Sequence, residues 1–161
     1  MAKIIIGVMG PGDGATETEV KYATELGKRI AGEHWVLLTG GRNLGVMEAA
    51  SKGAQESDGL TVGVLPTEDR RQMSNYVDIP ICTGMGSARN NLNVLSSDVI
   101  VACGSGAGTA SEVMLSLKAG KPLVLLHPSK SLLAFIEELP QSKPAIANSP
   151  KQALIHIKEL L

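Results

Sequence analysis

The sequence predicts an α/β fold in which a doubly wound parallel sheet of six to seven strands carries helices on both faces. Three observations lead to this prediction. Strand-like runs alternate with helical runs along the chain, most strand-like runs are apolar throughout, and glycine-rich turns separate several strands from the helices that follow. Unbroken apolar runs are typical of parallel strands buried on both faces, and the alternation favours crossover connections through helices.

The strands are predicted from their apolar runs and from the glycine or polar residues that bound them. A short final strand is expected near the C-terminus. The predicted strands are Lys3–Met9, His34–Thr39, Leu60–Leu65, Val77–Cys82, Asp98–Cys103, Pro122–Leu126 and Ala145–Ala147.

The helices are predicted from apolar residues at helical spacing. The predicted helices are Glu17–Ala31, Leu44–Glu56, Ala88–Leu95, Ala110–Ala119 and Lys151–Leu160, with a shorter helical turn over Ser131–Leu139. The first of these helices is expected to bury Val20, Ala23, Leu26, Gly27 and Ile30.

Two helix ends carry clear signals. Ser149 followed by Pro150 is typical of an N-cap and a first helical position, and Gly120 is expected to cap the C-terminus of the fourth helix. No linker or repeat interrupts the pattern, and 161 residues suit one domain, so we expect residues 1–161 to form a single domain.

Composition narrows the classes of function. The net charge of −1 gives no basic face for nucleic acid, and no apolar run approaches the length of a membrane span. The first residues form a strand rather than a signal peptide, so a cytoplasmic protein is expected. Cys82 and Cys103 are expected to stay reduced, and two cysteines alone predict no metal site.

The glycine-rich stretches all fall at one end of the predicted sheet. In a doubly wound sheet, ligands bind beyond the carboxyl ends of the strands, near the point where strand order reverses. This places one composite ligand site at the mouth of a Rossmann-like domain. The segments expected there are Gly10–Gly14, Thr39–Gly45, Thr83–Arg89, Cys103–Thr109 and His127–Lys130.

The turn Gly104–Thr109 is the strongest candidate for phosphate binding. Bare amides at a helix N-terminus bind anions, and glycine lets a phosphate approach the backbone. No Lys follows the last glycine, so a Walker-type ATP site is not supported. The ligand-binding candidates are Gly10, Pro11, Gly12, Gly40, Gly41, Arg42, Asn43, Gly84, Met85, Arg89, Gly104, Ser105, Gly106, Ala107, Gly108, Thr109 and Glu112.

Several candidates also have a purely structural interpretation. Thr109 and Glu112 fit a capping box, Arg89 fits a surface ion pair, and Asn43 fits a helix N-cap. Cys103 is best explained as a small buried thiol. The stretch Gly10–Ala15 has the spacing of a dinucleotide fingerprint, but the second strand ends without the acid that would hold a ribose, which disfavours NAD.

The ordered motifs resemble a known superfamily. These are Thr39-Gly40-Gly41 with Gly45-Val46-Met47-Glu48-Ala49-Ala50, then Arg89, Ser97-Asp98, and Gly106-x-Gly108-Thr109-x-x-Glu112. They are similar to the Rossmann-like lonely-guy proteins, formerly called lysine decarboxylases. In the enzymes of that superfamily, the cytokinin riboside 5′-monophosphate phosphoribohydrolases, an Arg and a Glu spaced like Arg89 and Glu112 cleave the N-glycosidic bond.

Three departures from the enzyme pattern resemble the molybdenum cofactor carrier proteins instead. They are Gly104–Thr109 in place of Pro-Gly-Gly-x-Gly-Thr, Asn90 after Arg89, and the first loop Gly7–Gly12. This resemblance implies non-catalytic binding, storage and protection of molybdenum cofactor, with no catalytic residue and no separate metal ion. It also implies a homo-oligomer, dimeric or tetrameric, with molybdenum enzymes as recipients. Nucleoside 5′-monophosphate hydrolysis by Arg89 and Glu112 remains the alternative, and whether Thr67–Ser74 forms a lid is left open.

Overall fold

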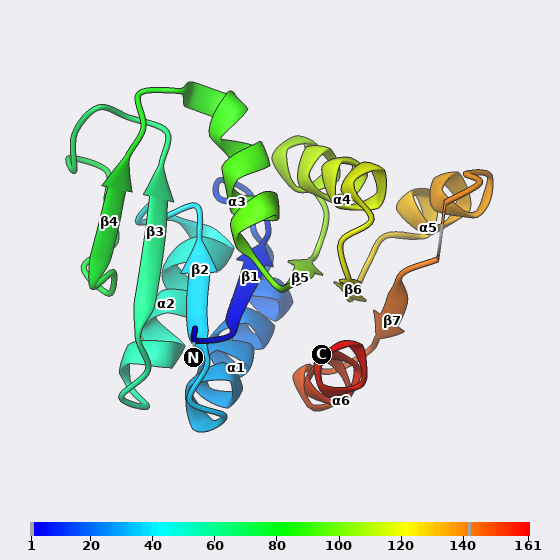
Figure 1. The fold of residues 1–161 in the computed structure, drawn as a ribbon, viewed down its shortest axis with the longest axis horizontal. Helices are drawn as coiled ribbons and strands as arrows, with labels where there is room; N and C mark the ends of the chain where they lie inside the picture. Colours follow the sequence, from blue (N-terminus) through cyan, green and yellow to red (C-terminus); the bar gives the residue numbers. More distant parts are fainter. Residues whose placement is uncertain (1, 142) are drawn as a thin grey trace.

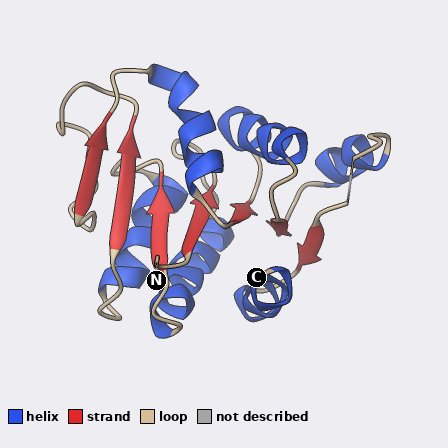
Figure 2. Ribbon diagram, in the orientation of Figure 1, coloured by secondary structure: helices blue, strands red, loops and turns tan. Residues whose placement is uncertain are grey.

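The core of the molecule is a seven-stranded sheet in which every neighbouring pair of strands is parallel. The computed structural model describes residues 2–141 and 143–161. The strand order is β4-β3-β2-β1-β5-β6-β7, visible in Figures 1 and 2. The strands are β1 (Ile5–Met9), β2 (Val36–Thr39), β3 (Thr61–Leu65), β4 (Ile79–Cys82), β5 (Val99–Cys103), β6 (Leu123–Leu126) and β7 (Ala145–Ala147).

Helices cover both faces of this sheet, as predicted (Figure 1). On one face lie α1 (Glu17–Gly32), α2 (Gly45–Gln55) and α6 (Pro150–Leu160), and they share an apolar cluster with β1, β2, β5 and β6. The other face carries α3 (Asn90–Ser96), α4 (Ala107–Ala119) and α5 (Lys130–Glu137), which pack on a second cluster. A short 3₁₀ turn, η1 (Gly86–Arg89), precedes α3. The doubly wound α/β prediction is therefore confirmed.

Strand order reverses between β1 and β5. The chain moves outward from β1 to β4, then returns to pair β5 with β1, with Gly7 opposite Ile100 and Met9 opposite Ala102. The carboxyl ends of β1 and β5 therefore diverge into connections on opposite faces of the sheet. This divergence opens the crevice in which ligands of doubly wound sheets bind.

β4 is shorter and more exposed than its sequence predicts. Val77 and Asp78 precede the strand, and Ile79 and Ile81 are each nearly half exposed. β4 stands at the sheet edge with β3 as its single partner. Pro80 lies within it, which is typical of edge strands because proline lacks an amide hydrogen.

Two expectations for the helices are wrong. Val20 is exposed, whereas Ala23, Leu26, Gly27 and Ile30 are buried as expected. The helix α1 begins with a capping box in which Thr16 and Glu19 each accept a bond from the other's backbone amide. This cap fixes the start of α1, and Val20, next to the buried Glu19, lies on the side of the helix that faces solvent. The second error concerns α4, which begins at Ala107 rather than Ala110.

The remaining helix ends follow their signals. Ser149 caps α6, with Pro150 at its start, and Gly120 ends α4 in the left-handed region at φ 65°. α5 begins one residue before the predicted Ser131 and ends at Glu137. In the described residues, no helix combines the length and the apolar character needed to cross a membrane.

Candidate functional site

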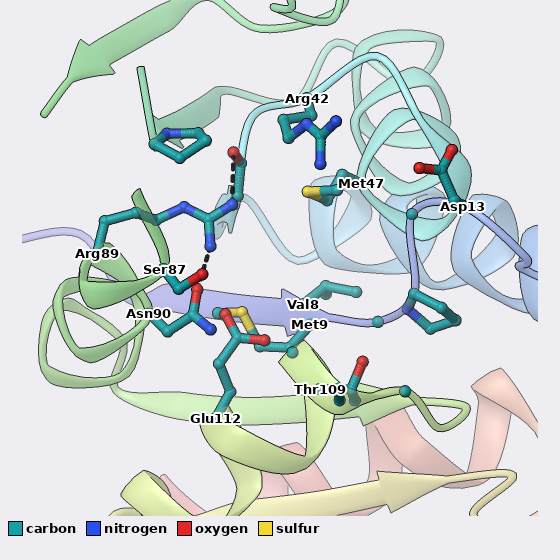
Figure 3. Close-up of a pocket in the computed structure, with 18 of the residues that line it drawn as sticks. Val8, Met9, Asp13, Arg42, Met47, Ser87, Arg89, Asn90, Thr109 and Glu112 are labelled. Carbon is teal, nitrogen blue, oxygen red and sulfur yellow. Dashed lines mark hydrogen bonds between the residues drawn. The ribbon is translucent and has the colours of Figure 1, made fainter. Parts of the chain in front are cut away.

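A cavity of about 360 Å³ opens at the carboxyl ends of the central strands, where strand order reverses. Figure 3 shows its walls, with β1 running across the middle, α4 on one side and the connection after β2 on the other. It is lined by Val8, Met9, Gly10, Pro11, Gly12, Asp13, Gly40, Arg42, Met47, Pro66, Gly86, Ser87, Arg89, Asn90, Gly106, Ala107, Gly108, Thr109 and Glu112.

The turn after β2 uses its amides to hold its own chain. Gly41 N–H donates to Thr39 Oγ1, and Asn43 N–H donates to the carbonyl of Gln72. At the start of α2, Val46 N–H donates to the carbonyl of Pro11 at 3.0 Å. This turn therefore offers the cavity mainly the Arg42 side chain and the surface of Gly40, rather than a ring of free amides.

The turn after β5 behaves differently. The N-cap of α4 is Gly106, which supplies no side-chain cap, and within the described residues no acceptor meets the N–H groups of Ala107, Gly108 or Thr109. Thr109 is 2% exposed, and its hydroxyl has no hydrogen-bond partner in the described structure. Figure 3 shows that hydroxyl directed into the cavity. The α4 N-terminus thus presents open donors beside its positive dipole end.

Arg89 is buried rather than placed in a surface ion pair. Its Nε donates to the carbonyl of Val64 at 2.8 Å, its Nη1 donates to Asn90 Oδ1, and its Nη2 reaches the carbonyl of Gly40. A Cβ on Gly40 would lie 2.6 Å from Arg89 Nη2, so glycine is needed there for the guanidinium to fit. Burial lowers the pKa of Arg89, Glu112 opposes this shift and Arg42 adds to it.

Glu112 lies in the second turn of α4, so the capping-box interpretation is wrong. Because the helix starts at Ala107, this carboxylate accepts a bond from Asn93 Nδ2 at 2.8 Å instead of reaching an N-cap amide. Burial raises the pKa of Glu112 to about 7, although the Asn93 bond and the charge of Arg89 both lower it. Arg89 and Glu112 line the same cavity but do not form an ion pair in the described residues.

Some sequence candidates do not line this cavity. Asn43 is exposed and is not the N-cap of α2, which is Leu44. Gly41 and Gly104 adopt left-handed backbone conformations at φ 75° and 79°, and a Cβ at Gly104 would overlap Glu19. The candidates outside the cavity lining are Gly41, Asn43, Gly84, Met85, Gly104 and Ser105.

Two further segments also lie outside the cavity lining. Residues 127–130 and Thr67–Ser74 contribute none of its walls. Cys103 is fully buried, as expected for a small thiol at a strand end, and burial raises the pKa of this thiol to about 12. Cys82 is exposed at the end of the edge strand.

Sequence reasoning missed several lining residues. Met9 and Met47 form part of the cavity floor beside Val8, and apolar residues in a strand or helix give no local signal of this role. Asn90 was noted only as a departure from the enzymes, yet its amide joins Arg89 to Ser111 Oγ. Pro66 is missed as well, whereas Asp13, Gly86 and Ser87 lie in the segments Gly10–Gly14 and Thr83–Arg89 that the sequence predicts at this site. Within the described residues, His, Cys, Asp and Glu side chains do not gather into a metal-binding group.

Solved structures resemble this chain over almost its full length. The molybdenum cofactor binding protein of the phototrophic bacterium Rippkaea orientalis is 52% identical, with a TM-score of 0.93, and the match covers 99% of this chain and 98% of that one. The molybdenum cofactor carrier protein of Chlamydomonas reinhardtii is 49% identical, with a TM-score of 0.92 and the same coverage. The predicted resemblance to the carrier proteins is confirmed.

A more distant relative is an enzyme. The cytokinin riboside 5′-monophosphate phosphoribohydrolase of Mycobacterium tuberculosis is 30% identical over 117 residues, which are 68% of this chain and 63% of the relative. The family model described as the SLOG cluster4 family matches residues 3–154. That match spans every strand of the sheet and both walls of the cavity, and the chain belongs to the SLOG cluster4 family.

Proposed function

We propose that this protein binds molybdenum cofactor as cargo and holds it without turning it over. The cofactor carries a terminal phosphate, a pyranopterin ring system and a dithiolene-bound oxo-molybdenum group. Two solved structures of proteins that bind or carry this cofactor match the chain at 49–52% identity over nearly all of both chains, which supports the same cargo here.

The α4 N-terminus is the observation that carries the proposal. Phosphate is bound by the N–H groups of Ala107, Gly108 and Thr109 together with the buried Thr109 hydroxyl, since these donors have no other partner in the described residues. The helix dipole favours the negative charge. Arg89 adds a buried cation to the lining of the same cavity.

Uptake of the cofactor tests this proposal. Purified protein is incubated with a cofactor source, separated from free cofactor, and assayed for pterin fluorescence after oxidation. The expected result is stoichiometric pterin for the parent and reduced retention for Thr109→Val, which keeps the side-chain size but loses the hydroxyl. Thr24→Val is the matched control, because the Thr24 hydroxyl bonds to the carbonyl of Val20 on α1, away from the cavity. A parent protein without pterin would refute the proposal.

Hydrolysis of nucleoside 5′-monophosphates is the competing function. It is favoured by one observation: Arg89 and Glu112 line one cavity, and the pKa of Glu112 near 7 suits proton transfer at neutral pH. The relative in Mycobacterium tuberculosis adds support at 30% identity. Incubation with AMP decides between the two functions. We expect no free adenine, whereas adenine release that Glu112→Gln abolishes would establish the hydrolase.

The proposed cargo also bears on the recipient of the cofactor, the cellular location and the assembly state of this protein. We propose that a molybdenum enzyme receives the cofactor, that the protein is cytoplasmic, and that it assembles as a dimer or tetramer. Light scattering of the purified protein measures its assembly state. Loss of pterin from the loaded protein on mixing with an apo molybdenum enzyme, with gain of activity by that enzyme, tests the transfer.

A further inference from the structure

Arg42 faces the cavity, and its charge has no partner among the residues that the structure describes. It follows Gly41 in the connection after β2, and its Nε is buried and has no hydrogen-bond partner in the described structure. It also takes part in none of the ion pairs formed by the described residues. A guanidinium donor buried without an acceptor costs free energy, which a bound ligand would relieve.

The position of Arg42 is set by its backbone. Arg42 forms an antiparallel bridge with Met73, Asn43 N–H donates to Gln72, and Ser74 N–H donates to the carbonyl of Gly41. These bonds fasten the connection after β2 to the segment Thr67–Ser74. The segment Thr67–Ser74 therefore supports the backbone of Arg42, whose side chain lines the cavity.

Within the described residues, no salt bridge compensates the charge of Arg42. Arg42 lowers the pKa of Arg89, because the two guanidinium groups repel each other. Arg89 bonds to neutral acceptors, the carbonyls of Val64 and Gly40 and the amide oxygen of Asn90. The two acids in the lining are Asp13, which is exposed at the rim, and Glu112, which bonds to Asn93.

Arg42 lies across the cavity from the α4 N-terminus. Figure 3 shows Arg42 above Met47 on one wall and Thr109 on the opposite wall, with Val8 and Met9 of β1 between them. The floor between the two walls is therefore apolar and includes two thioethers, which pack readily against a flat ring system. The cavity has an anion-binding end at α4, an apolar middle and a cationic end at Arg42.

We propose that Arg42 binds a second anionic group of the ligand, the oxo-metal head, while the α4 N-terminus holds its phosphate. This assignment rests on the proposed function and adds the orientation of the cargo. The ligand class is a phosphomonoester whose planar body carries another anion at its far end. Arg42 then distinguishes the metal-loaded cofactor from the metal-free dithiol form, since both share the phosphate and the ring system.

The test compares affinities for the metal-loaded and metal-free forms. Arg42→Met keeps the length and apolar character of the side chain but removes the charge. We expect it to weaken binding of the metal-loaded form by about tenfold and to change binding of the metal-free form by less than about twofold. Thr109→Val is expected to weaken both forms by equal factors. Arg29→Met is the matched control, because the Arg29 side chain pairs with Glu25 one turn earlier on α1 and lies outside this cavity.

Each outcome bears on a separate claim. Equal effects of Arg42→Met on both forms, or no effect on either, would overturn the assignment of Arg42 and leave the cargo proposal standing. A parent protein that binds neither form refutes the proposed function and this inference together. If Arg42→Met does not fold, Arg42→Gln serves instead: it removes the charge but keeps a polar side chain, and it should lose the preference for the metal-loaded form, whereas an unchanged preference would overturn the assignment.

Discussion

Glu112 is a buried carboxyl group without a cationic partner at bonding distance in the described residues. Its folded-state pKa, about 7, lies above the ordinary value of 4.5 because burial disfavours the charge. The folded state therefore binds the proton more tightly than the unfolded state does. Its stabilising contribution is complete below pH 4.5 and is lost as the pH rises to about 7, where the folded protein must ionise the group.

This carboxyl group predicts a pH-dependent effect of Glu112→Gln. The variant cannot ionise at this position, so relative to the parent it gains unfolding free energy between pH 5 and pH 8. Raising the pKa of Glu112 from 4.5 to about 7 corresponds to about 3 kcal/mol of unfolding free energy. Urea unfolding of both proteins at the two pH values measures the difference, in which groups common to both cancel. An equal difference at both pH values would show that Glu112 does not titrate in this range.

Arg89 predicts a change in affinity. Removing a charged hydrogen-bond donor to an anion costs roughly 1.5–3 kcal/mol, so Arg89→Ala is expected to weaken cargo binding by that amount. Calorimetric titration measures the dissociation constant. Unfolding of the same variant must be followed as well, because the carbonyl of Val64 loses its partner. An unchanged dissociation constant would show that Arg89 only donates hydrogen bonds to the surrounding carbonyls and does not contact the cargo.

Single residues were predictable where their chemistry is local. Glycines before a helix indicate an anion site, and this singled out Gly106, Gly108 and Thr109, which line the cavity. Glu112 was ambiguous because the capping-box pattern depends on where the helix starts, and no side chain marks the start at Ala107. Met47 and Asn90 stand out in the sequence only through the family resemblance, because their contacts with the site exist only after α2 and α3 pack on the sheet.

At the scale of elements, the contact between α1 and α2 is unusually close. A Cβ on Gly53 would lie 2.0 Å from the carbonyl oxygen of Thr24, and one on Gly27 would lie 2.1 Å from that of Ala50. Helices can approach this closely only where side chains are absent. The close packing holds α2 at the sheet, and the Val46 N–H at its start fixes the loop after β1.

This contact predicts that Gly53→Ala is destabilising. The added methyl overlaps backbone rather than a flexible side chain, and overpacking of this kind costs about 1–3 kcal/mol. Gly32→Ala is the matched control, since an added Cβ there meets no atom within 4 Å. Chemical unfolding should show a loss for Gly53→Ala and little change for Gly32→Ala. Equal stabilities would show that the helices separate at no cost.

Elements were predictable in type and order, less so in their limits. Every predicted strand and helix exists, because apolar runs and helical spacing are local properties of the chain. The edge position of β4 was not predictable, since Ile79 and Ile81 have the same apolar character as residues in buried strands. Strand order arises from packing, which no single segment encodes.

At the scale of the whole molecule, the cavity spans two halves of the domain. The loop after β1 and the connection after β2 form one wall, and α4 with η1 and α3 forms the other (Figure 3). The glycine-rich stretches predict this composite site, because they follow strands in both halves and all fall at one end of the predicted sheet. Their meeting point at the junction of β1 and β5 follows from the strand order.

The two-walled cavity predicts a distinctive pattern of amide exchange. Cargo binding should slow exchange at Ala107, Gly108 and Thr109, whose amides have no acceptor in the described residues. It should also slow exchange in the connection around Arg42, on the other wall. Hydrogen–deuterium exchange with mass spectrometry measures both segments. Protection confined to one wall would show that the ligand does not bridge the halves.

Gly10 lies at the seam between these two halves. A Cβ there would fall 2.5 Å from Val46 Cγ1 of α2 and 2.6 Å from the carbonyl oxygen of Cys103 on β5. The methyl group of an alanine at this position would overlap both neighbours, so α2 and β5 would have to move apart. The two walls therefore already lie as close together as their backbones allow. Sequence changes can alter the shape of the cavity only through side chains that project into it. Relatives with other ligands are expected to keep this glycine and to vary the positions that face it.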